Sequence, residues 1–207
     1  MLIRPAPVPG PRGTSSPGLP QFDPIWSRIS DAGILVGMHA SDSGYNQIAN
    51  WWEASSEFLP FAPSAFRMIS QGKRPISDTM AAMVCHGAFT RFPDLKVACV
   101  ENGANWVSHL LHDMADVYDK MPQQFDEDPT VAFLRNVYVN PFWEDNLSSL
   151  VDLVGPDHVL FGSDYPHPEG LKDPLSYVNE LEGMPDDTIR KVMGANLAGL
   201  MGVAVPV

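Results

Sequence analysis

The chain has few cysteines and few basic residues, and both shortages exclude classes of protein. Two cysteines, Cys85 and Cys99, occur in 207 residues, which is too few for a disulfide framework. Both lie among apolar neighbours, so we predict two buried free thiols. The 13 lysines and arginines are outnumbered by 25 aspartates and glutamates and form no basic stripe. Nucleic acids and anionic membranes are therefore not expected as partners.

Long apolar runs are also missing from the chain. No stretch approaches the roughly 18 apolar residues that a membrane-spanning helix requires, and the first residues, MLIRPAPVPGPRG, lack the apolar core of a secretory signal. Hydrophobic residues nevertheless make up 44% of the sequence, as in an ordinary globular protein. These properties predict a soluble, cytoplasmic protein.

Prolines concentrate near the start, before the regular part of the chain. Residues 5–20 hold six of the 20 prolines and have no face to bury, which predicts a loop or a mobile arm. We therefore divide the chain into residues 1–22, a strand stub at Leu2-Ile3 followed by this loop, and residues 23–207, the folded body. The stretch 42–75 has no clean period and predicts an insertion. Its aromatic residues either line a pocket or pack the insertion against the body: Trp51, Trp52, Phe58, Phe61 and Phe66.

From Asp23 onward, apolar runs of strand length alternate with helical patterns. The expected strands, besides the stub, cover residues 34–39, 95–100, 136–140 and 159–162. Strands that alternate with helices predict a parallel sheet with right-handed crossovers. The chain supplies at most five strand-helix units, and an eight-stranded barrel of about 250 residues would need three more. The sheet is therefore either open or part of a barrel.

Polar side chains follow several of these strands, above all Asp164 after the run 159–162. In a parallel sheet the carboxyl ends of the strands form the edge where ligands and metals bind, so Asp164 is a candidate catalytic acid. The alternative is that Asp164 opens the turn before Pro166. His39, Glu101 and Asn140 with Trp143 stand at the other strand ends.

Imidazole and carboxylate groups together are typical ligands of a divalent metal such as Zn²⁺. A strand-end histidine such as His39 can equally be a hydrogen-bonded structural residue. His167 lies three residues after Asp164, where it would touch a substrate or orient the acid. We interpret the four remaining histidines as structural or surface residues.

Three motifs resemble one enzyme family. Residues 155–167, GPDHVLFGSDYPH, resemble the last-strand signature of the amidohydrolase-2 branch of the amidohydrolase superfamily. Residues 91–97, RFPDLKV, resemble the family's lead-in to strand six, and residues 189–196, IRKVMGAN, resemble its closing segment. The resemblance extends from about Asp23 to Gly202.

The resemblance implies a metal-dependent (β/α)8 barrel that hydrolyses C–N or C–O bonds, or that decarboxylates or hydrates aromatic and unsaturated acids. By its motifs, His39 is the strand-five metal ligand and Asp164 binds the metal or takes the proton of its water. The expected metal is zinc, with manganese and iron as alternatives. The metal would lower the pKa of bound water towards about 7. We expect a small substrate, an aromatic carboxylic acid or an amide, bound with the help of His167, Trp143 and Asn102.

Two features differ from the family pattern. The family's first strand supplies a His-x-His, Glu-x-His or similar ligand pair, and no histidine precedes His39 here. By the family's strand count Leu2-Ile3-Arg4 is strand four, so the expected fold is a partial (β/α)8 barrel, about strands four to eight with their helices. Decarboxylase relatives carry a histidine after strand six, where this chain has Glu101. Glu101 is a candidate catalytic base or ligand, or it pairs with a neighbour.

Two hypotheses follow from these observations. The first is a metal-dependent hydrolase or decarboxylase that works through metal-activated water, with Asp164 as proton acceptor. The second is a catalytically silent barrel fragment that acts as an oligomerising or interaction domain. An exposed edge of a parallel sheet is usually covered, so we expect a homo-oligomer or a complementing N-terminal half as partner.

Overall fold

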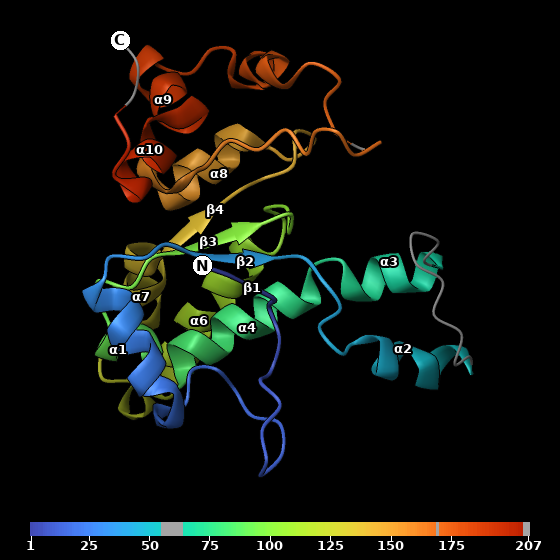
Figure 1. The fold of residues 1–207 in the computed structure, drawn as a ribbon, viewed down its shortest axis with the longest axis vertical. Coiled ribbons are helices and arrows are strands. Elements are labelled where there is room, and N and C mark those ends of the chain that lie inside the picture. Colours follow the sequence, from blue (N-terminus) through green and yellow to red (C-terminus); the bar gives the residue numbers. More distant parts are fainter. Residues whose placement is uncertain (55–63, 169, 205–207) are drawn as a thin grey trace.

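The computed structural model describes residues 1–54, 64–168 and 170–204. At its centre is a four-stranded sheet, whose strands follow one another in chain order and pair in parallel (Figure 1). Its strands are β1 (Leu2–Ile3), β2 (Val36–His39), β3 (Val97–Val100) and β4 (Val137–Val139). The α/β class and the parallel sheet predicted from the alternating pattern are thus confirmed.

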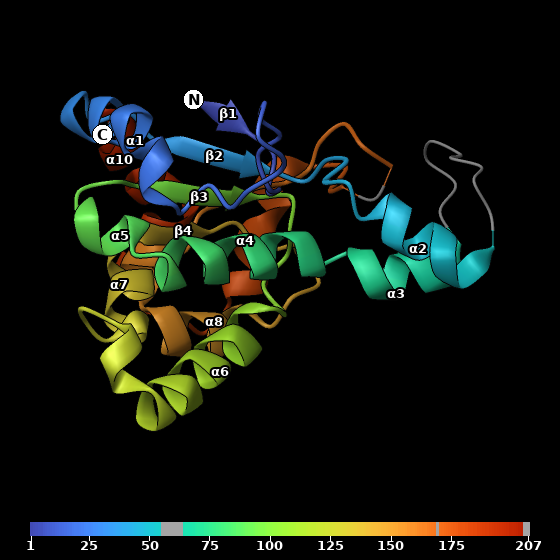
Figure 2. The ribbon, with the colours of Figure 1, turned by 90° about the horizontal axis from the view of Figure 1, so that it is seen from below.

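Helices connect the strands and bury one face of the sheet. The longer ones are α1 (Asp23–Asp31), α4 (Arg74–Cys85), α6 (Val107–Lys120), α7 (Pro129–Asn136) and α8 (Leu147–Val154). In Figure 2, α4, α5 (Ala88–Arg91) and α7 lie on one side of β2 and β3. Alternate strand residues such as Val36, Met38 and Cys99 point to this side and are fully buried. The core therefore lies between the sheet and these helices.

The other face of the sheet carries a row of paired residues, Leu2, Gly37, Ala98 and Tyr138, which we call the inner face. Residues directly opposite each other in neighbouring strands point to the same side of a sheet. Leu2, at the edge of this face, is 70% exposed. This edge of the sheet ends at β1, which pairs with β2 alone among the described residues.

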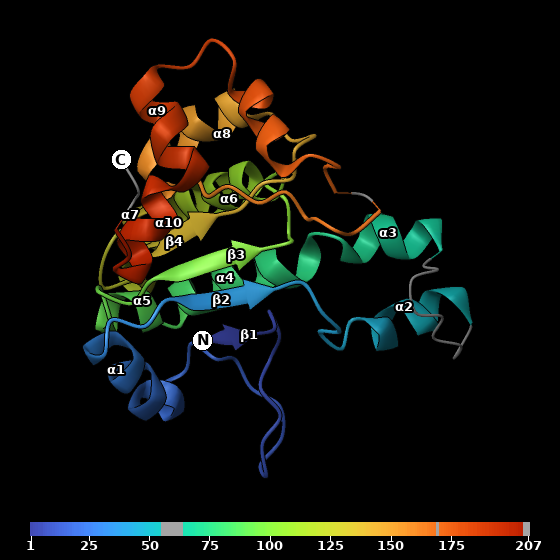
Figure 3. The same cartoon turned by 45° about the horizontal axis from the view of Figure 1, so that its top comes forward.

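The predicted strand at residues 159–162 forms only a bridge beside β4. Val159 pairs in parallel with Val139, and the Leu160 N–H donates to the Val139 carbonyl at 2.8 Å. The Phe161 N–H instead donates to the Val192 carbonyl in the C-terminal helices, at 3.0 Å. The strand prediction was therefore too long, because helix carbonyls replace a strand partner here. Figure 3 shows the C-terminal segment beyond β4.

The remaining elements are short. The C-terminal part holds a 3-10 helix at Pro174–Leu181, α9 (Asp186–Arg190), a π-helical turn at Lys191–Ala195 and α10 (Asn196–Met201). Further 3-10 turns are formed by Pro20–Phe22, Pro122–Gln124 and Pro156–His158. No described helix is both long and apolar enough to cross a lipid bilayer.

The proline-rich loop is anchored to the body of the protein. Val8 and Ser15 form an antiparallel bridge, and the Trp26 indole N–H donates to the Pro17 carbonyl at 2.7 Å. Arg91 donates to the Gly18 carbonyl at 2.9 Å. These hydrogen bonds tie the proline-rich segment to α1 and α5.

The insertion forms a helical pair that extends away from the sheet (Figures 1 and 2). Its helices are α2 (Asn46–Glu53) and α3 (Ala65–Gln71), joined by the buried Arg67, which donates to Glu53 at 2.7 Å. Trp51 and Trp52 are each 75% exposed, so they lie at the surface instead of lining a pocket. Phe66 contacts Trp52. Phe58 and Phe61, also named for this stretch, lie outside the described residues.

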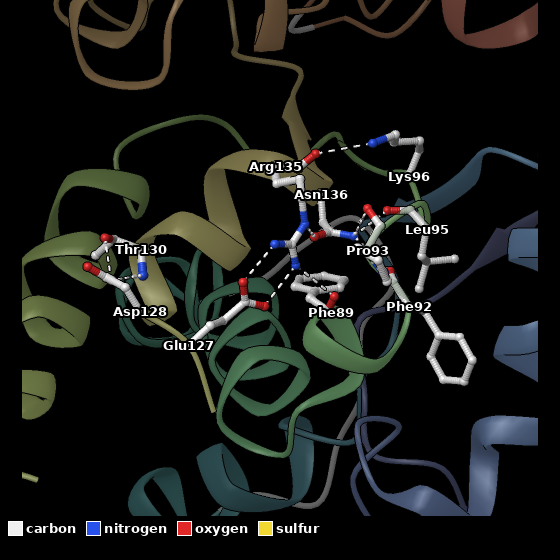
Figure 4. A network of polar contacts seen from close by, with 10 residues as sticks. All are labelled: Phe89, Phe92, Pro93, Leu95, Lys96, Glu127, Asp128, Thr130, Arg135 and Asn136. Carbon is white, nitrogen blue, oxygen red and sulfur yellow. Dashed lines mark hydrogen bonds and ion pairs between the residues drawn. The ribbon is translucent and has the colours of Figure 1, made fainter. Parts of the chain in front are cut away.

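A buried amide stabilises the turn before β3. Asn136, fully buried, donates to the carbonyls of Phe92, Pro93 and Leu95 at 3.1, 3.3 and 2.6 Å (Figure 4). Arg135 beside it binds Glu127 at 2.7 Å. Part of the RFPDLKV motif is therefore a turn whose carbonyls are satisfied by one side chain. The cysteine prediction was half right: Cys99 is buried, which raises the pKa of its thiol, but Cys85 is exposed because it ends α4.

Candidate active site

The carboxyl ends of the strands bring four predicted residues together. His39 ends β2, Glu101 follows β3, and Asp164 and His167 follow the bridge at Val159. The His39 Nε2 lies 3.1 Å from Glu101 Oε2, and the His167 Nδ1 lies 3.2 Å from Asp164 Oδ1 and 3.8 Å from Glu101 Oε1. Glu101 is therefore the member that links the two histidines. We call these four residues the strand-end cluster.

Both carboxylates of the cluster stand on unusual backbone. Glu101 has φ 53° and Asp164 has φ 56°, in the left-handed region, which Asp adopts more readily than Glu, so Glu101 is the rarer case. Such a conformation costs on the order of 1–3 kcal/mol and persists where the surrounding structure imposes it. The chain bends at Glu101, directly after β3, and Asp164 stands at the start of the turn that the His167 N–H closes.

Asn102 holds the bend after β3. Its side chain is buried, and its amide nitrogen donates to the carbonyls of Met38 at 3.0 Å and Val100 at 2.6 Å. These bonds tie the end of β3 to β2, which keeps Glu101 beside His39. The amide N–H groups of Asn102 thus have backbone partners, and a contact between this residue and a substrate stays a prediction.

The loop after Asp164 is closed by its own backbone hydrogen bonds. The His167 N–H donates to the Asp164 carbonyl at 2.9 Å, and the Leu171 N–H donates to the Ser163 carbonyl at 2.9 Å. Gly170 packs so closely that a Cβ atom there would lie 2.5 Å from the Asp164 carbonyl oxygen. A glycine is therefore required at this position. Sequence reasoning missed it, because no local pattern shows which backbone lies opposite a glycine.

A hydrogen bond to the backbone shows which ring nitrogen of His39 carries the proton. Its Nδ1 lies 2.7 Å from the Ala40 carbonyl oxygen, which only accepts, so Nδ1 carries the proton. A neutral His39 then turns the lone pair of Nε2 towards a Glu101 oxygen, and two acceptors at this distance need a proton or a cation between them. Metal-binding histidines commonly donate their other ring N–H to a carbonyl in this way.

The donor set of the cluster suits a divalent metal. Glu101, Asp164 and His167 each offer one ligand atom within 4.8 Å of the others. Burial and a hydrogen bond with Asp164 raise the pKa of Glu101, against the attraction of His39. Two carboxylates held this close repel each other unless a positive charge compensates them. Imidazole nitrogen and carboxylate oxygen are ligands of zinc, manganese and iron.

A pocket of about 260 Å³ opens beside the cluster and runs along the inner face. Glu101 and Asp164 line it, together with apolar residues that include Phe142 and Phe161. Trp143 is 36% exposed and is not among the residues that line this pocket, whereas its neighbour Phe142 is. A contact between Trp143 and a substrate stays a prediction. Sequence reasoning missed both phenylalanines. The alternation within the run 159–162 was the available signal for Phe161.

The fold and the cluster together define a parallel α/β protein with a candidate divalent-metal site at the carboxyl ends of its strands. A family model described as amidohydrolase matches residues 6–198. The chain belongs to the amidohydrolase family, as its motifs predicted.

Known proteins similar to this chain include decarboxylases. A 6-methylsalicylic acid decarboxylase of Penicillium expansum is 27% identical over 189 residues, 87% of this chain and 54% of that protein. The crystal structure of an amidohydrolase from Mycobacterium avium subsp. paratuberculosis is 42% identical, with a TM-score of 0.90 over 99% of this chain and 51% of that one.

A third similar protein contains a metal. It is a dihydroxybenzoic acid decarboxylase from Polaromonas with bound manganese and an inhibitor, 14% identical, with a TM-score of 0.68 over 97% of this chain and 60% of that one. At this identity the similarity concerns the fold alone. The chain spans about half the length of the curated relative and of the Mycobacterium structure.

Proposed function

We propose that this chain carries the strand-end part of a metal-dependent decarboxylase that acts on a small aromatic carboxylic acid. The observation that carries the proposal is the position of the strand-end cluster at an apolar pocket of about 260 Å³. An apolar pocket with a few convergent polar groups is typical of a site for a small, largely apolar ligand. The decarboxylase relatives support this choice over hydrolysis, which is the alternative chemistry.

Binding of an acid here depends on charge compensation. His39 and Asp164 would hold a divalent cation, with zinc, manganese and iron as candidates, and the bound cation would supply the positive charge that attracts a substrate carboxylate. Glu101 and Asp164 both line the pocket, and its described lining contains no lysine or arginine. Without a cation these two residues would repel an anionic substrate. The ring of the substrate would lie against Phe142 and Phe161.

Decarboxylation breaks a C–C bond and needs one proton on the carbon that loses CO₂. Asp164 lies on the pocket wall and would pass to this carbon a proton taken from a water molecule in the pocket, and the hydroxide left behind would combine with the CO₂ as bicarbonate. The His167 Nδ1, at 3.2 Å from Asp164 Oδ1, orients this carboxyl group. If the substrate were instead an amide or ester, Asp164 would accept a proton from the attacking water, which is its role in the hydrolytic alternative.

The test measures CO₂ release by the full chain loaded with Mn²⁺ or Zn²⁺ and supplied with a panel of hydroxylated benzoic acids. Asp164→Asn should lower kcat by at least about a hundredfold and leave the melting temperature nearly unchanged. Asp152→Asn, an exposed position on α8, is the matched control and should keep wild-type turnover. A residue that only opens a turn would instead lose about 1 kcal/mol of stability with unchanged turnover. Absence of CO₂ release from the metal-loaded chain contradicts the proposed function.

We further propose that protein covers the inner face, as the oligomerising hypothesis requires. Parallel sheets are almost always covered on both faces, and apolar side chains around this one are exposed: Leu2 by 70%, Phe142 by 39% and Leu197 by 37%. The cover would be a second copy or a polypeptide that carries the remaining strands of a barrel. Light scattering after gel filtration should give a mass above the 22.7 kDa of one chain, and a strict monomer contradicts self-association.

A further inference from the structure

We propose that Glu101 and His167 are ligands of the divalent cation, together with Asp164 and with His39 beside Glu101. This inference rests on the proposed function, because it concerns the same cation. The family motifs assign only His39 and Asp164 of this chain to the metal, and catalytic sites usually supply at least three protein ligands. With Glu101 and His167 beside Asp164 the chain itself would supply three ligands, whose atoms lie within 4.8 Å of one another.

Glu101, Asp164 and His167 each offer a ligand atom within 4.8 Å of the other two, and His39 lies beside Glu101, outside this group. Two atoms that each lie about 2.1 Å from a metal are about 3.0 Å apart at a right angle and about 3.4 Å apart at the tetrahedral angle. The His39–Glu101 and His167–Asp164 contacts measure 3.1 and 3.2 Å, and the His167–Glu101 contact measures 3.8 Å. Small side-chain movements therefore suffice to place a cation among them.

The charges of the cluster also fit a dication. Each oxygen of Glu101 faces one imidazole, Oε2 towards His39 and Oε1 towards His167. With neutral imidazoles, the two carboxylates of the cluster together balance the charge of one divalent ion. Glu101 is only partly exposed, with 25% of its side-chain surface accessible, and its αL backbone is held in place by Asn102. It is thus prepositioned between the other three residues.

The experiment titrates the metal-free full chain with Mn²⁺ alone and follows free Mn²⁺ by electron paramagnetic resonance. Wild type should bind one equivalent. Glu101→Gln keeps the shape of the side chain but loses its charge, and His167→Asn keeps a donor near Asp164 but loses the imidazole. Each should raise the Kd by at least about tenfold, as loss of a direct ligand costs no less than loss of its supporting contacts.

Two control variants match these changes on the outer surface. Glu182→Gln and His112→Asn remove the same groups at exposed positions and should bind Mn²⁺ within about twofold of wild type. Visible absorption of the Co²⁺-loaded protein provides a second readout. Loss of a ligand should change this spectrum, whereas a merely structural loss would lower the melting temperature of the metal-free protein and leave the spectrum of the bound fraction unchanged.

The outcomes separate this inference from the proposed function. A variant that binds Mn²⁺ as tightly as wild type with an unchanged Co²⁺ spectrum removes that residue from the ligand set and overturns the proposal for it. A wild-type chain that binds less than about a tenth of an equivalent overturns the whole proposal. Normal metal binding without any CO₂ release contradicts only the proposed function.

Discussion

At the scale of single residues, one buried amide supports the turn that precedes β3. Asn136 donates to three backbone carbonyls that the protein interior would otherwise leave unpaired. Asn136→Ala should lower the free energy of unfolding by about 3 kcal/mol, since buried unsatisfied carbonyls each carry a desolvation cost. Urea denaturation measures this change. Asn105→Ala, which removes one exposed contact with Asp145, is the control and should cost less than about 1 kcal/mol.

Glu101 should make the stability of the metal-free protein depend on pH. Burial and the hydrogen bond with Asp164 raise its pKa above the ordinary 4.5. A carboxyl group with a higher pKa in the folded state favours folding when protonated, so its contribution is full below about pH 4.5 and is lost as pH rises through the folded pKa. Between about pH 4.5 and pH 7, the free energy of unfolding should therefore fall less in Glu101→Gln than in wild type. Parallel curves for wild type and variant would contradict this assignment.

At the scale of elements, the loop 163–171 positions Asp164 by close backbone packing. A side chain at position 170 would press on the Asp164 carbonyl, with a Cβ at 2.5 Å. Gly170→Ala should therefore shift Asp164 and raise the Kd for Mn²⁺ by about tenfold, while the core remains folded. Gly199→Ala in α10 is the matched control. It has no atom within 4 Å of the added Cβ and should stabilise the helix by about 0.5–1 kcal/mol.

One result would contradict the prediction for Gly170. If Gly170→Ala binds Mn²⁺ like wild type, the close approach does not position Asp164, and the loop is only a connection between the bridge and the C-terminal helices. Mn²⁺ titration and circular dichroism on both glycine variants distinguish the two cases, since loss of the fold would appear as lost helical signal in addition to weaker binding.

At the scale of the whole molecule, the inner face predicts association. Leu197 lines the pocket on the inner face and is 37% exposed, whereas Leu153 on α8 is 39% exposed outside this pocket. If a second copy covers the inner face, Leu197→Asp should shift the protein towards the 22.7 kDa monomer, because a buried unpaired carboxylate opposes association. Leu153→Asp should leave the mass unchanged. An equal shift for both variants would contradict an interface at the inner face.

Local patterns in the sequence predicted most of the elements. Val107, Leu110 and Met114 recur at helical spacing and form the buried side of α6. The Asp128 side chain, just before Pro129, accepts from the Thr130 N–H at 2.8 Å and caps the start of α7. Such signals are reliable because capping bonds and side-chain periodicity involve residues close in the chain. The run 159–162 was predicted too long, because its partners lie elsewhere in the chain.

The sequence by itself therefore determined the alternation of strands and helices, the family, and the strand-end positions of His39, Glu101 and Asp164. The tertiary structure alone decided that Glu101 links His39 to His167, that Phe142 and not Trp143 lines the pocket, and that Cys85 is exposed. The physical reason is how far along the chain each signal reaches. A strand end is marked by residues that are its neighbours in the chain. Contacts between residues more than 60 positions apart, such as His39 and Glu101, depend on strand register and packing, which no local pattern contains.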